Sequence, residues 1–242
     1  MSLYKSLSFT QKMLVSMLAG AIIGIILNNI DAYHGIINEY LSNGLFDVVG
    51  KLFVNSLKML VVPLVFCSIT VGITSLGDLA LMGRIGIKAI FIYLITTAVA
   101  ISLAIVLSII INPGQGFEVK ESVTFTAKEA PALSSVITSI IPSNPILAMA
   151  EGEMLQIILF AIILGIAITI TGKNAEPFKK GLQSLNDIMM SMVSIVMKFA
   201  PIGVFFLIAK TFSTQGISMI VPLASYFFTV TIVLLLHVLL TY

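Results

Sequence analysis

The chain has 242 residues, of which 58% are apolar and only 10% are charged. Soluble domains carry about 25% charged residues, so this composition excludes a soluble enzyme, a nucleic-acid-binding protein and a disordered chain. The formal net charge of +2 is too small for a basic surface that follows a phosphate backbone. One cysteine and two histidines exclude an internal disulfide and a histidine or zinc cluster. The chain is predicted to be an all-α polytopic membrane protein, with membrane lipid around it.

Six apolar stretches approach the length of about 20 residues that a membrane-spanning helix needs. Their apolar runs are continuous rather than alternating, which indicates helices and not a β-barrel. The connection between the third and fourth stretches contains four prolines, and two short helical pieces are expected there, at residues 131–141 and 144–150. The six predicted spans cover residues 13–30, 45–76, 87–111, 154–171, 188–210 and 217–242.

Lysine and arginine are distributed unevenly between these spans, which predicts their orientation. With the N-terminus in the cytoplasm, seven basic residues fall in cytoplasmic segments: Lys5, Lys12, Arg84, Lys88, Lys173, Lys179 and Lys180. Only Lys120, Lys128 and Lys210 then fall outside, and Lys51, Lys58 and Lys198 lie within or at the ends of spans. The sequence therefore predicts a protein of the plasma (inner) membrane with both ends of this chain cytoplasmic.

The second predicted span carries charged residues and a proline. Asp47 and Lys51 are four residues apart with the acid first, which favours an ion pair along the helix. Lys58 must face protein, water or a lipid head group, because a charged side chain in hydrocarbon is costly. Two interpretations stay open for it: a structural lysine that snorkels, or a residue that lines an aqueous pathway. Pro63, in the same run, is expected to kink the helix.

Gly20 and Gly24 in the first span form a G-x-x-x-G pattern, which permits close contact between two helices. The pattern is common in apolar helices, so we assign it a packing role.

In the third span, Tyr93, Thr96 and Thr97 have the spacing i, i+3, i+4 and share one face of the helix. Three hydroxyls on one face can supply hard oxygen ligands to an alkali cation. The alternative is that the threonines bond back to carbonyls of their own helix, which is common in membrane helices. Tyr93 and Tyr226 also fall within spans rather than at span ends, where an interfacial tyrosine is expected.

Several blocks of the chain resemble, in order, the spans of the dicarboxylate/amino acid:cation symporter family, which includes the glutamate transporters. Together they cover nearly the whole chain. The blocks are residues 57–66 with Ser68 and Gly72, residues 83–86 with Tyr93, Thr96 and Thr97, residues 112–114, residues 142–145 with 160–167, and residues 199–205.

The resemblance implies a homotrimer that works by an elevator movement. Residues 1–86 and 113–216 are then scaffold, with a broken fourth span, whereas 87–112 and 217–242 belong to the mobile transport domain. Tyr93, Thr96 and Thr97 match a sodium (metal) site, incomplete by itself. Lys58, Pro63 and Ser68 are implied to lie on the face along which the transport domain slides, where some members also conduct anions.

The resemblance further implies that two re-entrant hairpins and two last spans, which hold the substrate site, follow after residue 242. The implied function is the N-terminal part of a secondary symporter that imports acidic amino acids or dicarboxylates. Na+ or H+ would be the coupling ion, with a small anionic substrate, no organic cofactor and no nucleic acid. Two alternatives stay open: a trimerising scaffold fragment without transport activity, and an anion leak along the second and fifth spans. No catalytic motif points to an enzyme.

Overall fold

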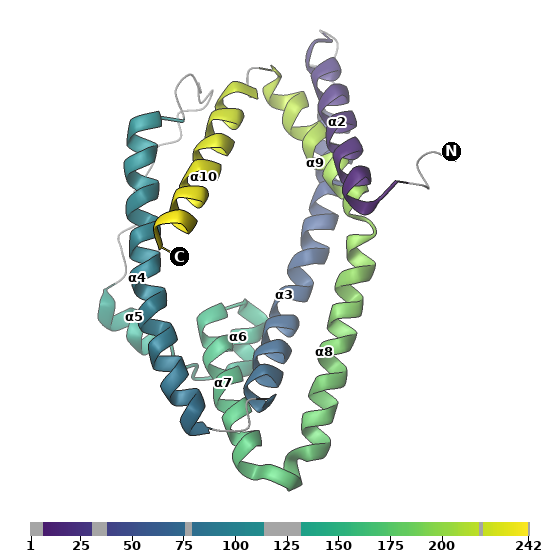
Figure 1. Ribbon diagram of the computed structural model, residues 1–242. Helices are drawn as coiled ribbons and strands as arrows, with labels where there is room; N and C mark the ends of the chain where they lie inside the picture. Colours follow the sequence, from purple (N-terminus) through teal and green to yellow (C-terminus); the bar gives the residue numbers. More distant parts are fainter. Residues whose placement is uncertain (1–6, 31–37, 76–78, 114–131, 218–219, 242) are drawn as a thin grey trace.

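A computed structural model describes residues 7–30, 38–75, 79–113, 132–217 and 220–241, and these parts of the chain are helical apart from their connections (Figure 1). The all-α class is therefore confirmed. Lys5, Lys120 and Lys128 lie outside the described residues. The elements are α2 (Phe9–Asn28), the π-helix η2 (Asn38–Phe46), α3 (Asp47–Ser75), α4 (Leu79–Ile111), α5 (Leu133–Ser139), α6 (Pro145–Glu151), α7 (Met154–Thr171), the 3-10 helix η3 (Gly172–Ala175), α8 (Glu176–Met197), α9 (Ala200–Gln215) and α10 (Ile220–Thr241).

Several helix ends are set by local sequence signals. Ser8 forms a capping box before α2: its hydroxyl accepts from the Gln11 N–H, and the Gln11 side chain accepts from the Ser8 N–H. Asn144 caps α6, which starts with Pro145, and Gly152 ends this helix in the left-handed conformation at φ 74°. The short helices α5 and α6 confirm the two helical pieces expected in the proline-containing connection.

The helices pack in two groups: in Figure 1, α4 and α10 lie at the left, α2, α3, α8 and α9 towards the right, and α7 between them. In the first group, α2 packs along α9, and α3 packs against α7, α8 and α9. In the second group, α4 packs against α10. We call these the packed group and the α4–α10 pair. The Phe66 and Phe160 rings stack between α3 and α7 with centroids 6.0 Å apart, whereas α4 has no buried residue among those described.

The α2–α9 contact is built on the two glycines of the G-x-x-x-G pattern, and its predicted packing role is confirmed. A Cβ atom on Gly20 would lie 2.6 Å from the carbonyl oxygen of Phe205. A Cβ atom on Gly24 would lie 2.6 Å from the carbonyl oxygen of Ala209. Only glycine leaves room for the α9 backbone at these two positions.

The predicted fifth span, residues 188–210, is not one helix. Helix α8 ends at Met197 and α9 begins at Ala200, with Pro201 in its first turn. Proline has no N–H to donate, and its ring clashes with the carbonyl four residues earlier, which is that of Met197. The proline that follows the junction therefore explains the break. Lys210, the last residue of the predicted fifth span, lies inside α9.

Five helical segments of the described chain are long and apolar enough to cross a membrane: Phe9–Asn28, Tyr40–Ser75, Gly83–Ile111, Met154–Met197 and Leu223–Thr241. The segment Met154–Met197 contains both α7 and α8, and α9 has only 16 residues. Successive long helices alternate in direction, except that α9 continues the course of α8 (Figure 1). At about 1.5 Å per residue, α3 and α4 exceed a hydrocarbon core of about 30 Å, so they must tilt or extend into the head-group region.

Candidate functional site

The predicted cation-binding hydroxyls lie on α4, in the α4–α10 pair. Tyr93, Thr96 and Thr97 share a face of this helix, with Tyr93 67% exposed and both threonines half-buried. The Thr96 hydroxyl donates to the Tyr93 carbonyl oxygen at 3.0 Å. This is the back-bonding that the alternative interpretation of the threonines requires.

That hydrogen bond does not remove Thr96 as a ligand. A hydroxyl that donates its proton keeps two lone pairs on oxygen, and a cation binds to those lone pairs. The hydrogen bond to Tyr93 also fixes the rotamer, so the lone pairs have a defined direction. Hard cations take several oxygen ligands, and three hydroxyls are too few. Within the described residues, no group of three or more His, Cys, Asp or Glu side chains is arranged so that it could hold a metal ion.

The second predicted set lies on α3. Lys58 and Ser68 are exposed, and Pro63 is half-buried in a helix that runs through it without a break. The buried residues Leu60 and Cys67 come two and nine residues after Lys58, on the nearly opposite side of the helix. Lys58 therefore points away from the core of the packed group. The two predicted sets lie on helices from different groups, and each set stays a prediction.

A cluster of charged residues lies at the start of α3. The Asp47 carboxylate pairs with the Lys51 ammonium at 2.6 Å, which confirms the pair expected from sequence spacing. The other carboxylate oxygen accepts from the Lys210 ammonium of α9, so one acid holds two bases. Asp47 is only 14% exposed and Lys210 33%, whereas Lys51 is largely exposed. The cluster joins α3 to α9 and keeps one unit of positive charge.

The sequence analysis did not find the pairing of Lys210, because its partner lies 163 positions away. Next to it, buried hydroxyls of Ser42 and Ser213 share a hydrogen bond of 2.9 Å. The Asn28 side-chain amide donates to the Ser213 carbonyl at 2.8 Å. These bonds tie the ends of α2, η2 and α9 together. No local spacing reveals the set, because its members come from three separate segments.

Helices α4 and α10 enclose a pocket of about 280 Å³. Its polar lining comes from Ser108, Tyr226 and Thr229, and the Thr229 hydroxyl donates to the Ser225 carbonyl at 2.7 Å. Tyr226, singled out by its position within a span, therefore lines a pocket. The remaining lining is aliphatic or proline: Ala104, Pro113, Val230, Val233 and Leu234.

The fold defines a multi-pass helical membrane protein, with a closely packed helix group and a helix pair that carries hydroxyl groups. The family model of the Sodium:dicarboxylate symporter family matches residues 9–242. The chain belongs to this family, which confirms the resemblance found in its sequence, and it is a transporter-family protein rather than an enzyme.

Individual relatives agree with this assignment. The chain is 35% identical to the proton/glutamate-aspartate symporter of Escherichia coli over 228 residues, which are 89% of the chain and 51% of that protein. It is 29% identical to the C4-dicarboxylate transport protein of Laribacter hongkongensis over 231 residues, covering 92% of the chain and 49% of the relative. It is 33% identical to the proton/sodium-glutamate symport protein of Geobacillus stearothermophilus over 214 residues, covering 85% and 50%. The chain thus spans about half the length of the curated relatives it matches.

Proposed function

We propose that the chain is the N-terminal part of a secondary active symporter that imports acidic amino acids or C4-dicarboxylates with Na+ or H+. The observation that carries the proposal is the family match over residues 9–242. The relatives support the substrate class and the coupling ions, because they are symporters or transport proteins for glutamate, aspartate or C4-dicarboxylates, the symporters with protons or sodium. These substrates are small anions, and in a symporter their uptake against a gradient is driven by the inward gradient of the coupled cation.

We further propose an elevator arrangement, in which the packed group is scaffold and the α4–α10 pair belongs to the moving part. Its support is the division of helix contacts, because α4 packs chiefly on α10. A part that shifts as a rigid body needs an interface that can slide, and interlocked glycine contacts like those of Gly20 and Gly24 oppose sliding. In this proposal, Lys58, Pro63 and Ser68 lie on the sliding face of α3.

Tyr93, Thr96 and Thr97 form, in this proposal, a partial site for the coupling cation. What supports it is their common face on α4 and the Thr96 hydrogen bond, which orients one oxygen. The cation is Na+ if hydroxyl and carbonyl oxygens are its ligands. We also propose a homotrimer in the plasma (inner) membrane, with both ends of this chain cytoplasmic, as the distribution of basic residues predicts.

Uptake measured on the product of the complete gene tests the function. Proteoliposomes are loaded to impose either a Na+ gradient or a proton gradient, and uptake of labelled aspartate, glutamate and succinate is followed. We expect uptake of at least one of these substrates under one gradient and none without a gradient. No uptake of any acidic amino acid or C4-dicarboxylate under either gradient would sink the substrate proposal.

The packed group also favours a second candidate, a trimerising scaffold without transport of its own. Its helices α2, α3, α7, α8 and α9 contact one another without help from the α4–α10 pair. Crosslinking of the 242-residue chain in membranes discriminates, because the scaffold candidate requires oligomers. A chain that stays monomeric at every crosslinker concentration argues against it.

A further inference from the structure

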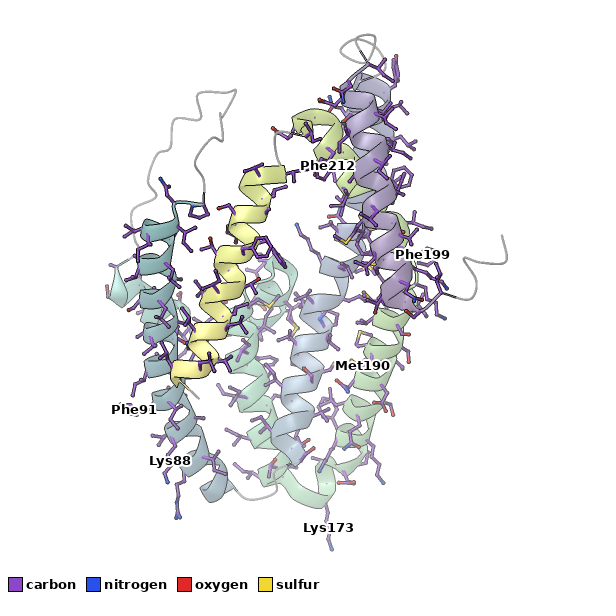
Figure 2. All side chains as sticks on the ribbon, turned by 45° about the horizontal axis from the view of Figure 1, so that its top comes forward. Lys88, Phe91, Lys173, Met190, Phe199 and Phe212 are labelled. Carbon is purple, nitrogen blue, oxygen red and sulfur yellow. The ribbon has the colours of Figure 1, made fainter. Side chains whose placement is uncertain are left out.

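Basic residues gather where α7, η3 and α8 meet the end of α3. Lys173 lies in η3, and Lys179 and Lys180 lie in the first turns of α8. Figure 2 shows Lys173 at the same end of the molecule as Lys88 of α4. Glu176 is the acid of this turn, and its carboxylate lies 3.9 Å from the Lys180 ammonium. We call Lys173, Lys179 and Lys180 the turn lysines. Together with Glu176 they form a cluster of three bases and one acid, which has a net positive charge.

A pocket of about 230 Å³ lies within this cluster, between the ends of α3 and α7 and the start of α8. The Lys179 ammonium donates to the carbonyl oxygen of Thr74 at 3.0 Å, which holds the charge at the pocket wall. Glu176 also lines the pocket, and the hydroxyls of Thr74 and Thr169 there donate to backbone carbonyls of their own helices. The pocket lining itself therefore carries one base, Lys179, and one acid, Glu176, and the excess positive charge of the cluster comes from Lys173 and Lys180, which lie next to lining residues in the chain.

Two large, exposed apolar residues are neighbours in sequence of the pocket-lining residues Thr169 and Lys179. Ile170 at the end of α7 is 70% exposed, and Phe178, directly before Lys179, is 55% exposed. Both belong to the segment Met154–Met197, which is long and apolar enough to enter a membrane. A free anion in water gains nothing from exposed apolar neighbours, whereas an amphiphile gains from burying its chains against them.

We propose that the turn lysines bind the head group of an anionic phospholipid at this turn, with the acyl chains along Ile170 and Phe178. Clusters of lysines at the ends of membrane helices attract anionic head groups, and each lysine near the membrane surface strengthens such binding. The ends of the helices place the cluster at the depth of the head groups. The site is separate from the α4 hydroxyls and binds lipid rather than transport substrate.

Native mass spectrometry of the purified 242-residue chain tests the proposal. The chain, in a mild detergent, is titrated with phosphatidylglycerol, with phosphatidylcholine of the same acyl chains, and with inorganic phosphate. We expect phosphatidylglycerol adducts at a concentration roughly tenfold lower than phosphatidylcholine adducts. The double variant K173Q/K180Q is expected to remove this preference, because two of the three positive charges are lost. Lys179 is not changed, because its ammonium also donates a hydrogen bond to the Thr74 carbonyl at the end of α3.

The matched control is R84Q/K88Q, which removes two positive charges from α4 and leaves the pocket intact. We expect this variant to keep the phosphatidylglycerol preference. Helix content by circular dichroism confirms that both variants are folded. Equal affinity for the two lipids, an unchanged preference in K173Q/K180Q, or an equal loss in R84Q/K88Q would each overturn the proposal. Binding of inorganic phosphate as tight as that of phosphatidylglycerol would overturn the lipid assignment and leave a simple anion site.

Discussion

The α2–α9 contact and the α4–α10 contact join helices of similar apolarity in different ways. In α2, the buried residues are small: Ser16, Gly20 and Gly24. They let the backbone of α9 approach so closely that a Cβ atom at Gly20 would overlap a carbonyl oxygen. In α4, the described side chains are large and largely exposed, as Phe91 and Ile109 illustrate, and Gly83 and Gly86 face open space.

The difference shows that apolar character alone does not hold two helices together in a membrane. Lipid chains are as apolar as leucine, so association depends on close packing and on interhelical hydrogen bonds. The packed group has both, in its glycine contacts and in the Asp47–Lys210 ion pair. The α4–α10 pair has a pocket at its contact instead. The contact between α4 and α10 is therefore looser than the contact between α2 and α9.

The largest expected effect comes from adding a methyl group at the close contact between α2 and α9. The variant G20A places a methyl group 2.6 Å from a backbone oxygen that cannot rotate away. Overpacking of this kind costs about 1–3 kcal/mol, so thermal unfolding in detergent is expected at a clearly lower temperature. The matched control is G86A in α4, where nothing lies within 4 Å, and it is expected to be neutral or stabilising by up to about 1 kcal/mol. Equal destabilisation by both variants would contradict the contrast between the two contacts.

A second effect, within the packed group, concerns the charged cluster at the start of α3. Asp47→Asn leaves the Lys210 ammonium without its carboxylate, and this ammonium is only partly exposed. We expect a lower melting temperature for Asp47→Asn, and little further loss when Lys210→Met is added to it. The variant Lys51→Met is expected to change less, because that ammonium is largely exposed. A double-mutant cycle measures the coupling; strictly additive effects of Asp47→Asn and Lys210→Met would show that the pair stabilises nothing.

The third effect concerns function in the α4–α10 pair rather than stability. In the complete transporter, Thr96→Val removes one oxygen from the proposed cation site and keeps the side-chain shape. We expect the Na+ concentration for half-maximal uptake to rise roughly tenfold, since a hydrogen bond or ligand to a charged group contributes about 1.5–3 kcal/mol. Ser102→Ala is the control, because Ser102 also bonds back to its helix but lies nine residues, about two and a half turns, after Tyr93, on the opposite face. If both variants kept the wild-type Na+ dependence, the α4 hydroxyls would be packing residues.

The sequence predicted the ends of a helix well where polar residues or glycine flank an apolar run. Helix α7 occupies residues 154–171, as expected, because Glu153 and Gly172 flank it. The sequence failed at Pro201, because the predicted fifth span breaks before it into α8 and α9, whereas Pro63 lies inside the continuous α3 as the predicted second span requires. Whether a helix continues through a proline depends on whether neighbouring groups form hydrogen bonds with the backbone carbonyl that the proline leaves unpaired. These neighbours come from other parts of the chain, so the local sequence does not predict the result.

The same limit applies to the polar residues. The Asp47–Lys51 pair was predictable because residues four apart meet on any helix. Lys210 was not, since its contact with Asp47 depends on how α9 crosses α3. The common face of Tyr93, Thr96 and Thr97 follows from helix periodicity alone, so the sequence predicted the face of the candidate site. It does not provide the other ligands, because those depend on tertiary packing.

The smallest expected effect tests the joint between α3 and α8. Lys179→Met removes the donor that reaches the Thr74 carbonyl at 3.0 Å and keeps most of the aliphatic stem. A half-exposed hydrogen bond of this kind contributes about 0.5–1.5 kcal/mol, so unfolding in neutral detergent is expected at a slightly lower temperature. Lys180→Met is the control, because its ammonium is exposed and 3.9 Å from Glu176, and such surface pairs contribute about 0–1 kcal/mol. If Lys180→Met destabilised the chain more than Lys179→Met, surface charge rather than the bond to α3 would dominate at this end of α8.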